Sequence, residues 1–274
     1  MITSARQQAS PLTYRSLIWN FAQRDLKSRY KGTALGWFWS LLLPLATLGI
    51  FSLVFSTLMK FTPPPFGNGD TGNFTVFLFC GLVVWGAFSN SINITMLTLI
   101  GTGPLLKKIY FPVYAPILGS IIAALFQSVI ELGILLLVLV AIGNLGATWL
   151  LVPFWALLFV LFVTGITLGL SILNVFYRDL AHLVSVGLQL LFYLTPIIYP
   201  PSTLAGKKFH GIDVSTILNL NPVAAFVNLF RDLVYGLTPG SAATWGYALL
   251  WACLAMAFGA WAASARGQDL SEEL

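Results

Sequence analysis

The stretch "RDLKSRYKGTALGWFWSLLLPLATLGIFSLVFSTLM", residues 24–59, places four cations within eight residues and then continues to Met59 without a charged side chain. About 20 apolar residues in a helix cross the hydrocarbon core of a bilayer. The stretch therefore predicts a transmembrane helix with a strongly basic segment directly before it.

The rest of the chain has the same character. Charged residues make up 8% of the 274 residues, the apolar set reaches 58%, and the mean hydropathy is +0.87, whereas a soluble domain has about 25% charged residues. Further charge-free runs cover residues 71–106, 132–177, 180–206 and 233–265. Because these runs are continuously apolar and do not alternate, they favour helices over a barrel. The chain is expected to be an all-α membrane protein.

Six spans are predicted. They lie near residues 34–59, 73–99, 113–142, 149–175, 180–200 and 242–264, and "GNLGATW" at 143–149 supplies the turn that divides the longest run. Within residues 201–240, the apolar stretch 216–230 is interrupted by Asn219, Asn221 and Pro222, and Arg231 and Asp232 follow it. The region favours a re-entrant or interfacial pair of short helices outside; if it did span, the C-terminus would lie outside.

The positions of lysine and arginine predict the orientation. With the N-terminus in the cytoplasm, ten cations lie inside and four outside, which agrees with the positive-inside rule. The outside set is Lys60, Lys207, Lys208 and Arg231. The expected division is a cytoplasmic segment 1–31, a transmembrane domain 32–264 and a cytoplasmic tail 265–274.

The segment before the first span is predicted to be an amphipathic helix, with Ser10 as its cap and Pro11 in its first turn. Its apolar face consists of Tyr14, Leu17, Ile18, Phe21 and Ala22. We expect this helix to lie flat on the inner membrane surface, where each cation gains about 1 kcal/mol from anionic headgroups. For any single cation, setting the topology is an equally good explanation.

Nucleotide, metal and hydrolase motifs are missing from the sequence. "GTGPLLKK" at 101–108 has neither the spacing nor the hydroxyl of a phosphate-binding loop. Cys80 and Cys253 lie inside apolar runs, which argues against a metal site or disulfide framework. Glu131 is the one carboxylate deep in an apolar run, and Gln127 precedes it by one helical turn, so a structural hydrogen-bonded pair competes with a functional role. We therefore expect no catalytic residues, no metal site and no bound cofactor.

The loop between the second and third spans is predicted to contain a short helix at 104–111, and an ordinary loop is the alternative. The helix would present Leu105, Leu106, Lys107, Lys108, Ile109, Tyr110 and Phe111. Aromatic residues gather near the expected interfaces and form either an ordinary aromatic belt or the lining of a tunnel for sugars. They are Trp37, Phe38, Trp39, Trp85, Phe88, Phe192, Tyr193 and Tyr199.

These parts, in this order, resemble the permease subunits of ABC-2-type polysaccharide exporters. The resemblance covers nearly the whole chain and rests on four stretches together. They are "RDLKSRYKGTALGWFWSLLLPL" (24–45), "NVFYRDL" (174–180), "LFYLTPIIYP" (191–200) and "LNPVAAFVNLFRDLVYG" (220–236).

The resemblance implies a homodimer with two copies of a separate ATPase subunit, which would use ATP and Mg²⁺. It implies that the segment up to Tyr30 is an interface helix, that the loop helix couples to the ATPase, and that Asn221, Pro222, Arg231 and Asp232 belong to the gate. The implied substrate is a polysaccharide on a polyprenyl pyrophosphate, and no nucleic acid is expected. Its pyrophosphate would meet the cations before the first span, namely Arg24, Lys27, Arg29 and Lys31.

Two other functions stay open at this stage. The first is a drug or small-lipid exporter of the same superfamily. The second is a membrane enzyme acting on polyprenyl-linked sugars, for which Arg178, Asp179 and His182 form the candidate cluster. The polymer itself cannot be identified from these motifs.

Overall fold

The structure is a computed structural model. It describes residues 14–32, 34–58, 60, 62–106, 111–200, 208–209, 212–213, 218, 220–267 and 270. Within these ranges the regular structure is helical, apart from two-residue strands β1 (Lys208–Phe209) and β2 (Ile212–Asp213), which pair antiparallel. The predicted all-helical class is confirmed.

Four helical segments are long and apolar enough to cross a membrane. They comprise α3 (Phe74–Thr95) with the first part of α4 (Thr98–Leu106), α5 (Tyr114–Ile142), the 3₁₀ turn η3 (Ala147–Leu151) with α6 (Val152–Phe176), and α10 (Ala242–Arg266). Gly143 ends α5 in the left-handed conformation, with φ of 78°, which glycine adopts without steric cost. The predicted spans near 73–99, 113–142, 149–175 and 242–264 agree with these segments.

The other two predicted spans are shorter than expected. The first begins with the 3₁₀ turn η1 (Gly36–Phe38), continues as α2 (Trp39–Ser52) and ends as the π-helical segment η2 (Leu53–Leu58). The fifth, α7 (Leu180–Leu194), ends before residue 200 because Pro196 disfavours a helical conformation of Thr195. The apolar helix within the first span, Pro44–Leu58, and α7 are both shorter than the roughly 20 residues that cross a bilayer without tilt or thinning.

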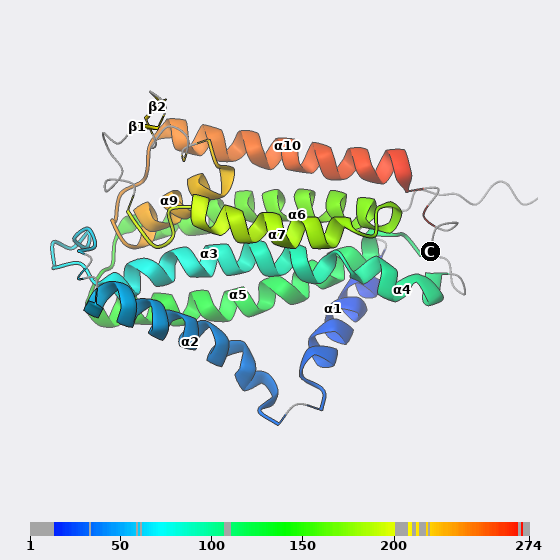
Figure 1. Cartoon of the computed structure of the whole chain (residues 1–274), viewed down its shortest axis with the longest axis horizontal. Coiled ribbons are helices and arrows are strands. Elements are labelled where there is room, and N and C mark those ends of the chain that lie inside the picture. Colours follow the sequence, from blue (N-terminus) through cyan, green and yellow to red (C-terminus); the bar gives the residue numbers. More distant parts are fainter. Residues whose placement is uncertain are drawn as a thin grey trace, which may run out of the picture.

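The long helices alternate in direction along the bundle (Figure 1). Helices α2, α5 and α7 run toward one end, and α3, α6 and α10 run back. Helix α1 (Arg15–Tyr30) is inclined to the bundle and lies near the beginning of α5, whereas α9 (Pro222–Val234) lies at the opposite end. We call these two ends the α1 end and the α9 end.

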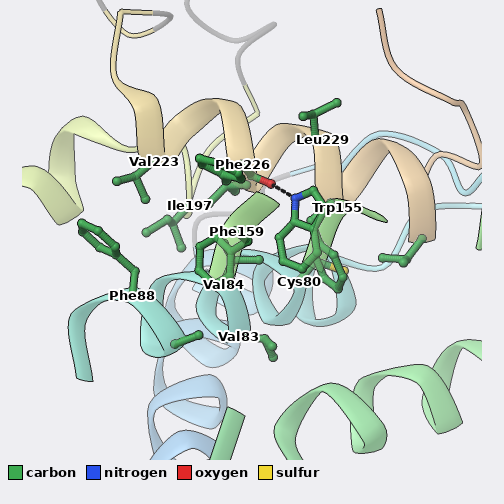
Figure 2. Close-up of a cluster of buried hydrophobic side chains, with 14 of the residues drawn as sticks. Cys80, Val83, Val84, Phe88, Trp155, Phe159, Ile197, Val223, Phe226 and Leu229 are labelled. Carbon is green, nitrogen blue, oxygen red and sulfur yellow. Dashed lines mark hydrogen bonds between the residues drawn. The ribbon is translucent and has the colours of Figure 1, made fainter. Parts of the chain in front are cut away.

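The core lies between α3, α6 and α9. Phe162 of α6 stacks on Phe88 of α3 and on Phe226 of α9, with ring centroids 5.7 and 4.8 Å apart. The indole nitrogen of Trp155 donates a hydrogen bond of 3.0 Å to the carbonyl of Phe226, as Figure 2 shows. Buried indole nitrogens need such a partner. This bond and the stacked rings fix α9 against the two long helices.

Candidate functional site

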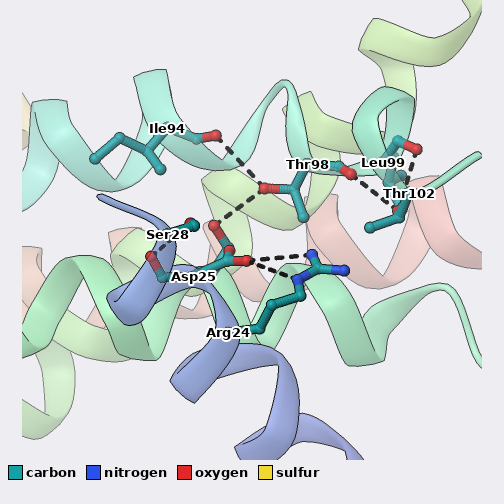
Figure 3. Close-up of polar contacts among 8 residues, drawn as sticks. Arg24, Asp25, Ser28, Ile94, Thr98, Leu99 and Thr102 are labelled. Atoms are coloured by element: carbon teal, nitrogen blue, oxygen red, sulfur yellow. Dashed lines mark hydrogen bonds and ion pairs between the residues drawn. The ribbon is translucent and has the colours of Figure 1, made fainter. Parts of the chain in front are cut away.

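The basic surface of α1 has three kinds of cation. Lys27 and Lys31 are exposed, and Arg29 is half-buried. Arg24 lies 4.8 Å above the ring of Phe21, and its guanidinium pairs with Asp25 at 3.2 Å (Figure 3). An exposed pair of this kind contributes little stability, but Asp25 offsets one of the four charges expected to meet an anion. Sequence reasoning counted the cations and overlooked this carboxylate.

The apolar face of α1 packs on protein, so the prediction that this face rests on the membrane surface is wrong. Phe21 and Ala22 are buried, and the ring of Phe21 lies 5.3 Å from that of Phe111. A methyl group built on Gly119 of α5 would lie only 2.6 Å from the Cβ of Phe21. Periodicity identified the apolar face correctly, but it could not tell whether lipid or another helix covers it. Ser10 and Pro11 lie outside the described residues.

Aromatic side chains of α2, α3 and α7 meet in one cluster. The ring of Phe192 lies 6.3 Å from that of Phe51, 5.5 Å from that of Trp85 and 5.5 Å from that of Tyr193. Tyr193 is 69% exposed, and the hydroxyl of Tyr199 donates a hydrogen bond to its carbonyl. Three of the predicted aromatic residues, Trp85, Phe192 and Tyr193, are therefore brought together.

A small open pocket of about 300 Å³ adjoins this cluster. Besides the rings it is lined by polar side chains of α3 and α7, which are Ser89, Asn93, Ser185 and Gln189. Hydroxyl and amide groups are uncommon on a surface that meets lipid, because each unsatisfied polar group is costly there. These four residues carry the polar character of the site, and sequence reasoning missed them. In the sequence, the two polar residues of each helix are four positions apart, which places them on one helix face. This spacing could have identified them.

Among the remaining predicted aromatic residues, Phe88 contacts the cluster through Trp85, with ring centroids 5.9 Å apart. Phe88 is buried in the core, so the prediction that it lines a tunnel is wrong for this conformation of the chain. Phe38 and Trp39 are exposed at the start of α2. Trp39 precedes Phe51 by twelve residues, which is about 18 Å along a helix. The side chain of Trp37 lies outside the described residues.

The predicted loop helix at 104–111 is wrong at both ends that the structure describes, which are residues 104–106 and Phe111. Leu105 and Leu106 form the last turn of α4, which begins at Thr98 and continues through Gly101, Gly103 and Pro104. The hydroxyls of Thr98 and Thr102 donate hydrogen bonds to backbone carbonyls one helical turn earlier (Figure 3). The Thr98 hydroxyl also donates to the hydroxyl of Ser120 on α5. Phe111 is non-helical and buried against α1. Lys107, Lys108, Ile109 and Tyr110 lie outside the described residues.

Helix α9 is held by its first residues and by Arg231. The Asn221 side chain caps the helix by accepting from the Val223 amide at 3.0 Å, and it also donates to the Thr195 hydroxyl at 2.9 Å. Pro222 follows in the first turn, where a missing N–H costs nothing. The predicted gate residues Asn221 and Pro222 are thus the residues that begin the helix.

Arg231 is buried, although its charge predicted a place on the outer surface. Its guanidinium donates to the carbonyls of Phe77, Pro196 and Ile197 and lies 3.8 Å above the Phe77 ring. Among the described residues, the sole ion pair joins Arg24 and Asp25, so the charge of Arg231 is balanced by carbonyl dipoles. Arg231 links α9 to α3 and to the turn after α7.

Asp232 faces an open pocket of about 630 Å³ at the α9 end, which Asn228 and Tyr247 also line. Partial burial raises the pKa of the Asp232 carboxyl to about 6, against the opposing influence of the Arg231 charge. The pKa of this carboxyl therefore lies between its ordinary value and neutral pH.

The predicted pair in α5 is present. Glu131 is buried, and its carboxylate accepts a hydrogen bond of 3.2 Å from the Gln127 amide. This contact within one helix supports the structural explanation of the pair.

The candidate enzymatic residues do not form a cluster. Arg178, Asp179 and His182 are exposed, and the contact between the last two is a backbone bond at the start of α7. No group of three or more His, Cys, Asp or Glu side chains in the described ranges could hold a metal ion.

The comparison with known proteins gives the family. Residues 16–235 match the family model described as ABC-2 type transporter. The chain belongs to the ABC-2 type transporter family. This assignment agrees with the all-helical fold, the long apolar helices and the resemblance carried by the four sequence stretches.

Individual relatives cover most of the chain. An O-antigen export system permease protein RfbA of Myxococcus xanthus is 32% identical over 81% of this chain and 81% of its own length. A protein of the same name in Klebsiella pneumoniae is 32% identical over 77% of this chain and 76% of its own length. A polysialic acid transport protein KpsM of Escherichia coli is 25% identical over 77% and 78%, respectively. This ABC-2 transporter chain is therefore similar along most of its length to proteins named for polysaccharide export.

Proposed function

We propose that this chain is the membrane permease subunit of an ATP-driven exporter that moves a lipid-linked polysaccharide out of the bacterial cytoplasm. The observation that carries the proposal is the 32% identity to an O-antigen export permease over 81% of both chains. The substrate class is a glycan on a polyprenyl pyrophosphate, of the O-antigen, teichoic-acid or cell-wall galactan type. ATP and Mg²⁺ act in a separate ATPase subunit, present in two copies.

The proposed topology has six passes, with both termini in the cytoplasm. The alternating directions of α2, α3, α5, α6, α7 and α10 support it (Figure 1). The short helices α2 and α7 cross by tilting or by thinning the bilayer around them. Helix α9 then forms part of an external gate, and the loop at 104–111 contacts the ATPase.

The proposed path for the glycan lies between two copies of this chain, at the faces of α2, α3 and α7. Large side chains on these faces are exposed, including Ile50 and Tyr193. Trp85, Phe192 and Tyr193 offer ring faces to sugar C–H surfaces, and Ser89, Asn93, Ser185 and Gln189 offer hydrogen bonds to hydroxyls. The exposed cations Lys27 and Lys31 lie where the pyrophosphate would be gathered.

ATP hydrolysis by the purified complex tests this function. We expect a polyprenyl-pyrophosphate glycan to stimulate hydrolysis by the chain with its ATPase subunit in nanodiscs, and deletion of the chain to stop export. A double variant, Lys27→Gln with Lys31→Gln, should require more glycolipid for half-maximal stimulation, because a charge-assisted phosphate contact contributes roughly 1.5–3 kcal/mol. The proposal would be excluded if the glycolipid did not change the rate of ATP hydrolysis and export continued after deletion of this chain.

The exposed ring of Tyr193 gives a second prediction. We expect Tyr193→Ala to lower glycan export about 2- to 10-fold, because one aromatic contact contributes roughly 0.5–1.5 kcal/mol. Export is measured as surface glycan per permease molecule in the membrane. Leu190→Ala is the matched control, since Leu190 is 63% exposed on the same helix but has no ring. Equal effects of the two substitutions would argue against a sugar contact at Tyr193.

A drug or small-lipid exporter is the main competing function. It shares the permease fold and the coupling to an ATPase, and it would show substrate stimulation by apolar compounds in the same assay. Tyr193→Ala would then alter drug resistance and leave surface glycan unchanged. A membrane enzyme is disfavoured by the dispersed, exposed positions of Arg178, Asp179 and His182. It would regain support if Asp179→Asn abolished sugar transfer in the absence of any ATPase.

A further inference from the structure

A groove between α1, α5 and α6 plays no part in the proposed export path. Its volume is about 950 Å³, and its lining is largely apolar. Each helix contributes one stripe at helical spacing. Ile18 and Trp19 come from α1, residues 118, 121, 122 and 125 come from α5, and Val160 and Thr164 come from α6. Such spacing places the side chains of each helix on a single face, so one face of each helix forms one wall of the groove.

The groove is open, and exposed apolar side chains lie on all three of its walls. Trp19 is 53% exposed, and Ile122 and Val160 on the other two walls are also exposed. Leu118 and Leu125 lie four and eleven residues from the start of α5, which corresponds to about 6 and 16 Å along the helix. One leaflet contributes about 15 Å of hydrocarbon. On the α5 wall, the apolar part of the groove therefore has about the depth of one leaflet at the α1 end. On the α6 wall it reaches deeper, because Thr164 and Val160 lie about 18 and 24 Å before the end of α6 at Phe176.

The α1 end of the groove is polar. Arg15 and Ser16 line it there, and both are exposed. Arg15 is the one charged residue in the lining. An arginine fork binds phosphate oxygens well, and an exposed tryptophan is typical of the level of lipid headgroups. A cation and a hydroxyl above an apolar channel match a molecule with an anionic phosphate and an acyl chain.

We propose that this groove binds an acidic membrane phospholipid. Its phosphate contacts Arg15 and Ser16, and one acyl chain lies between Trp19, Ile122 and Val160. The bound lipid fills the space between α1 and α6, so that it joins the inclined helix to the bundle. The depth of the α5 wall matches one phospholipid acyl chain, and a polyprenyl chain is the occupant that the displacement test below would reveal instead. The proposal does not depend on which substrate the exporter carries.

Quenching of Trp19 fluorescence tests the proposal. The full chain is placed in phosphatidylcholine nanodiscs with increasing amounts of phosphatidylglycerol brominated on its acyl chains, and the Trp19 signal is the difference between wild type and Trp19→Phe. We expect half-maximal quenching at a mole fraction about fivefold lower for brominated phosphatidylglycerol than for brominated phosphatidylcholine, since one cation near the surface gives about this preference. Arg15→Gln should remove the preference, and Val160→Phe should reduce quenching by both lipids.

Lys27→Gln is the matched control, because it removes one exposed charge from the same helix outside the groove. It should leave the preference for phosphatidylglycerol intact. Equal quenching by both brominated lipids in the wild type, or equal losses in Arg15→Gln and Lys27→Gln, would overturn the proposal by showing general surface attraction only. The proposal would also be overturned if polyprenyl phosphate displaced brominated phosphatidylglycerol at a lower concentration than unlabelled phosphatidylglycerol does. The groove would then bind the polyprenyl lipid instead. Because no glycan is present, the result is independent of the export assay.

Discussion

Replacing Arg231 with alanine is expected to lower the free energy of unfolding by about 3–5 kcal/mol, because each buried acceptor that loses its donor costs roughly 1–3 kcal/mol. The substitution leaves the carbonyls of Phe77, Pro196 and Ile197 without their donor and opens a cavity beside the Phe77 ring. Helix α9 then loses its attachment to α3 and to the turn after α7. The measurement is the thermal unfolding midpoint of the purified chain in one detergent, together with the amount of folded chain in the membrane.

Two further variants show whether geometry or charge is responsible. Arg231→Lys keeps the charge but loses the planar fork that reaches several carbonyls, so we expect an intermediate loss. Asp232→Asn is the control in the next position of α9. Because burial raises the pKa of Asp232 to about 6, removing its charge should cost little near neutral pH or stabilise the fold slightly. An Arg231→Ala chain as stable as Asp232→Asn would contradict this role of Arg231.

The Arg231 contacts also limit how the proposed gate, of which α9 is a part, could open. A methyl group on Gly81 of α3 would lie 2.6 Å from the Arg231 guanidinium, so the side chain is closely surrounded as well as hydrogen-bonded. Moving α9 alone would leave a charge and three carbonyls unpaired in a place with little water. We infer that α9 moves together with the adjoining ends of α3 and α7.

The charge-free runs predicted the long helices well, because a chain in lipid must satisfy its backbone within each segment. Helices α5 and α10 begin and end within two residues of the predicted limits. Local chemistry explains the error at α7, where Pro196 follows an apolar run that has no other break. Hydropathy alone treats Leu191 to Pro200 as one continuous apolar helix, but the backbone leaves the helical conformation at Thr195.

Side-chain surroundings were harder to predict, since they depend on residues distant in the sequence. Arg231 is an external cation by the positive-inside rule, yet its carbonyl partner Phe77 is 154 positions away. Phe88 belongs to the same aromatic group as Trp85 by composition, but only the packing of α6 shows that Phe88 is covered. A single sequence shows the type of residue at each position, but it does not show which distant residues pack against it.

Helices α6 and α10 approach each other so closely that their contact allows no side chain at Gly165. A methyl group built there would lie 2.2 Å from the Ala255 carbonyl carbon and 2.4 Å from the Met256 amide nitrogen. Gly259 faces Gly165 from the other helix, where a methyl group would lie 2.7 Å from the Gly165 oxygen. Small residues at such positions let helices in a membrane pack through their backbones. The atoms in the way are backbone atoms, which cannot rotate aside.

We therefore expect Gly165→Ala to destabilise the chain by about 1–3 kcal/mol, the usual cost of overpacking, and Gly165→Val to prevent accumulation of folded protein. Gly246→Ala is the matched control on α10, because its added methyl group meets nothing within 4 Å. The same substitution there should stabilise the helix by up to about 1 kcal/mol. Opposite shifts of the thermal unfolding midpoint for the two Gly→Ala variants would support the close contact of α6 and α10. A Gly165→Ala chain with an unchanged or raised midpoint would show that the two helices do not touch through their backbones.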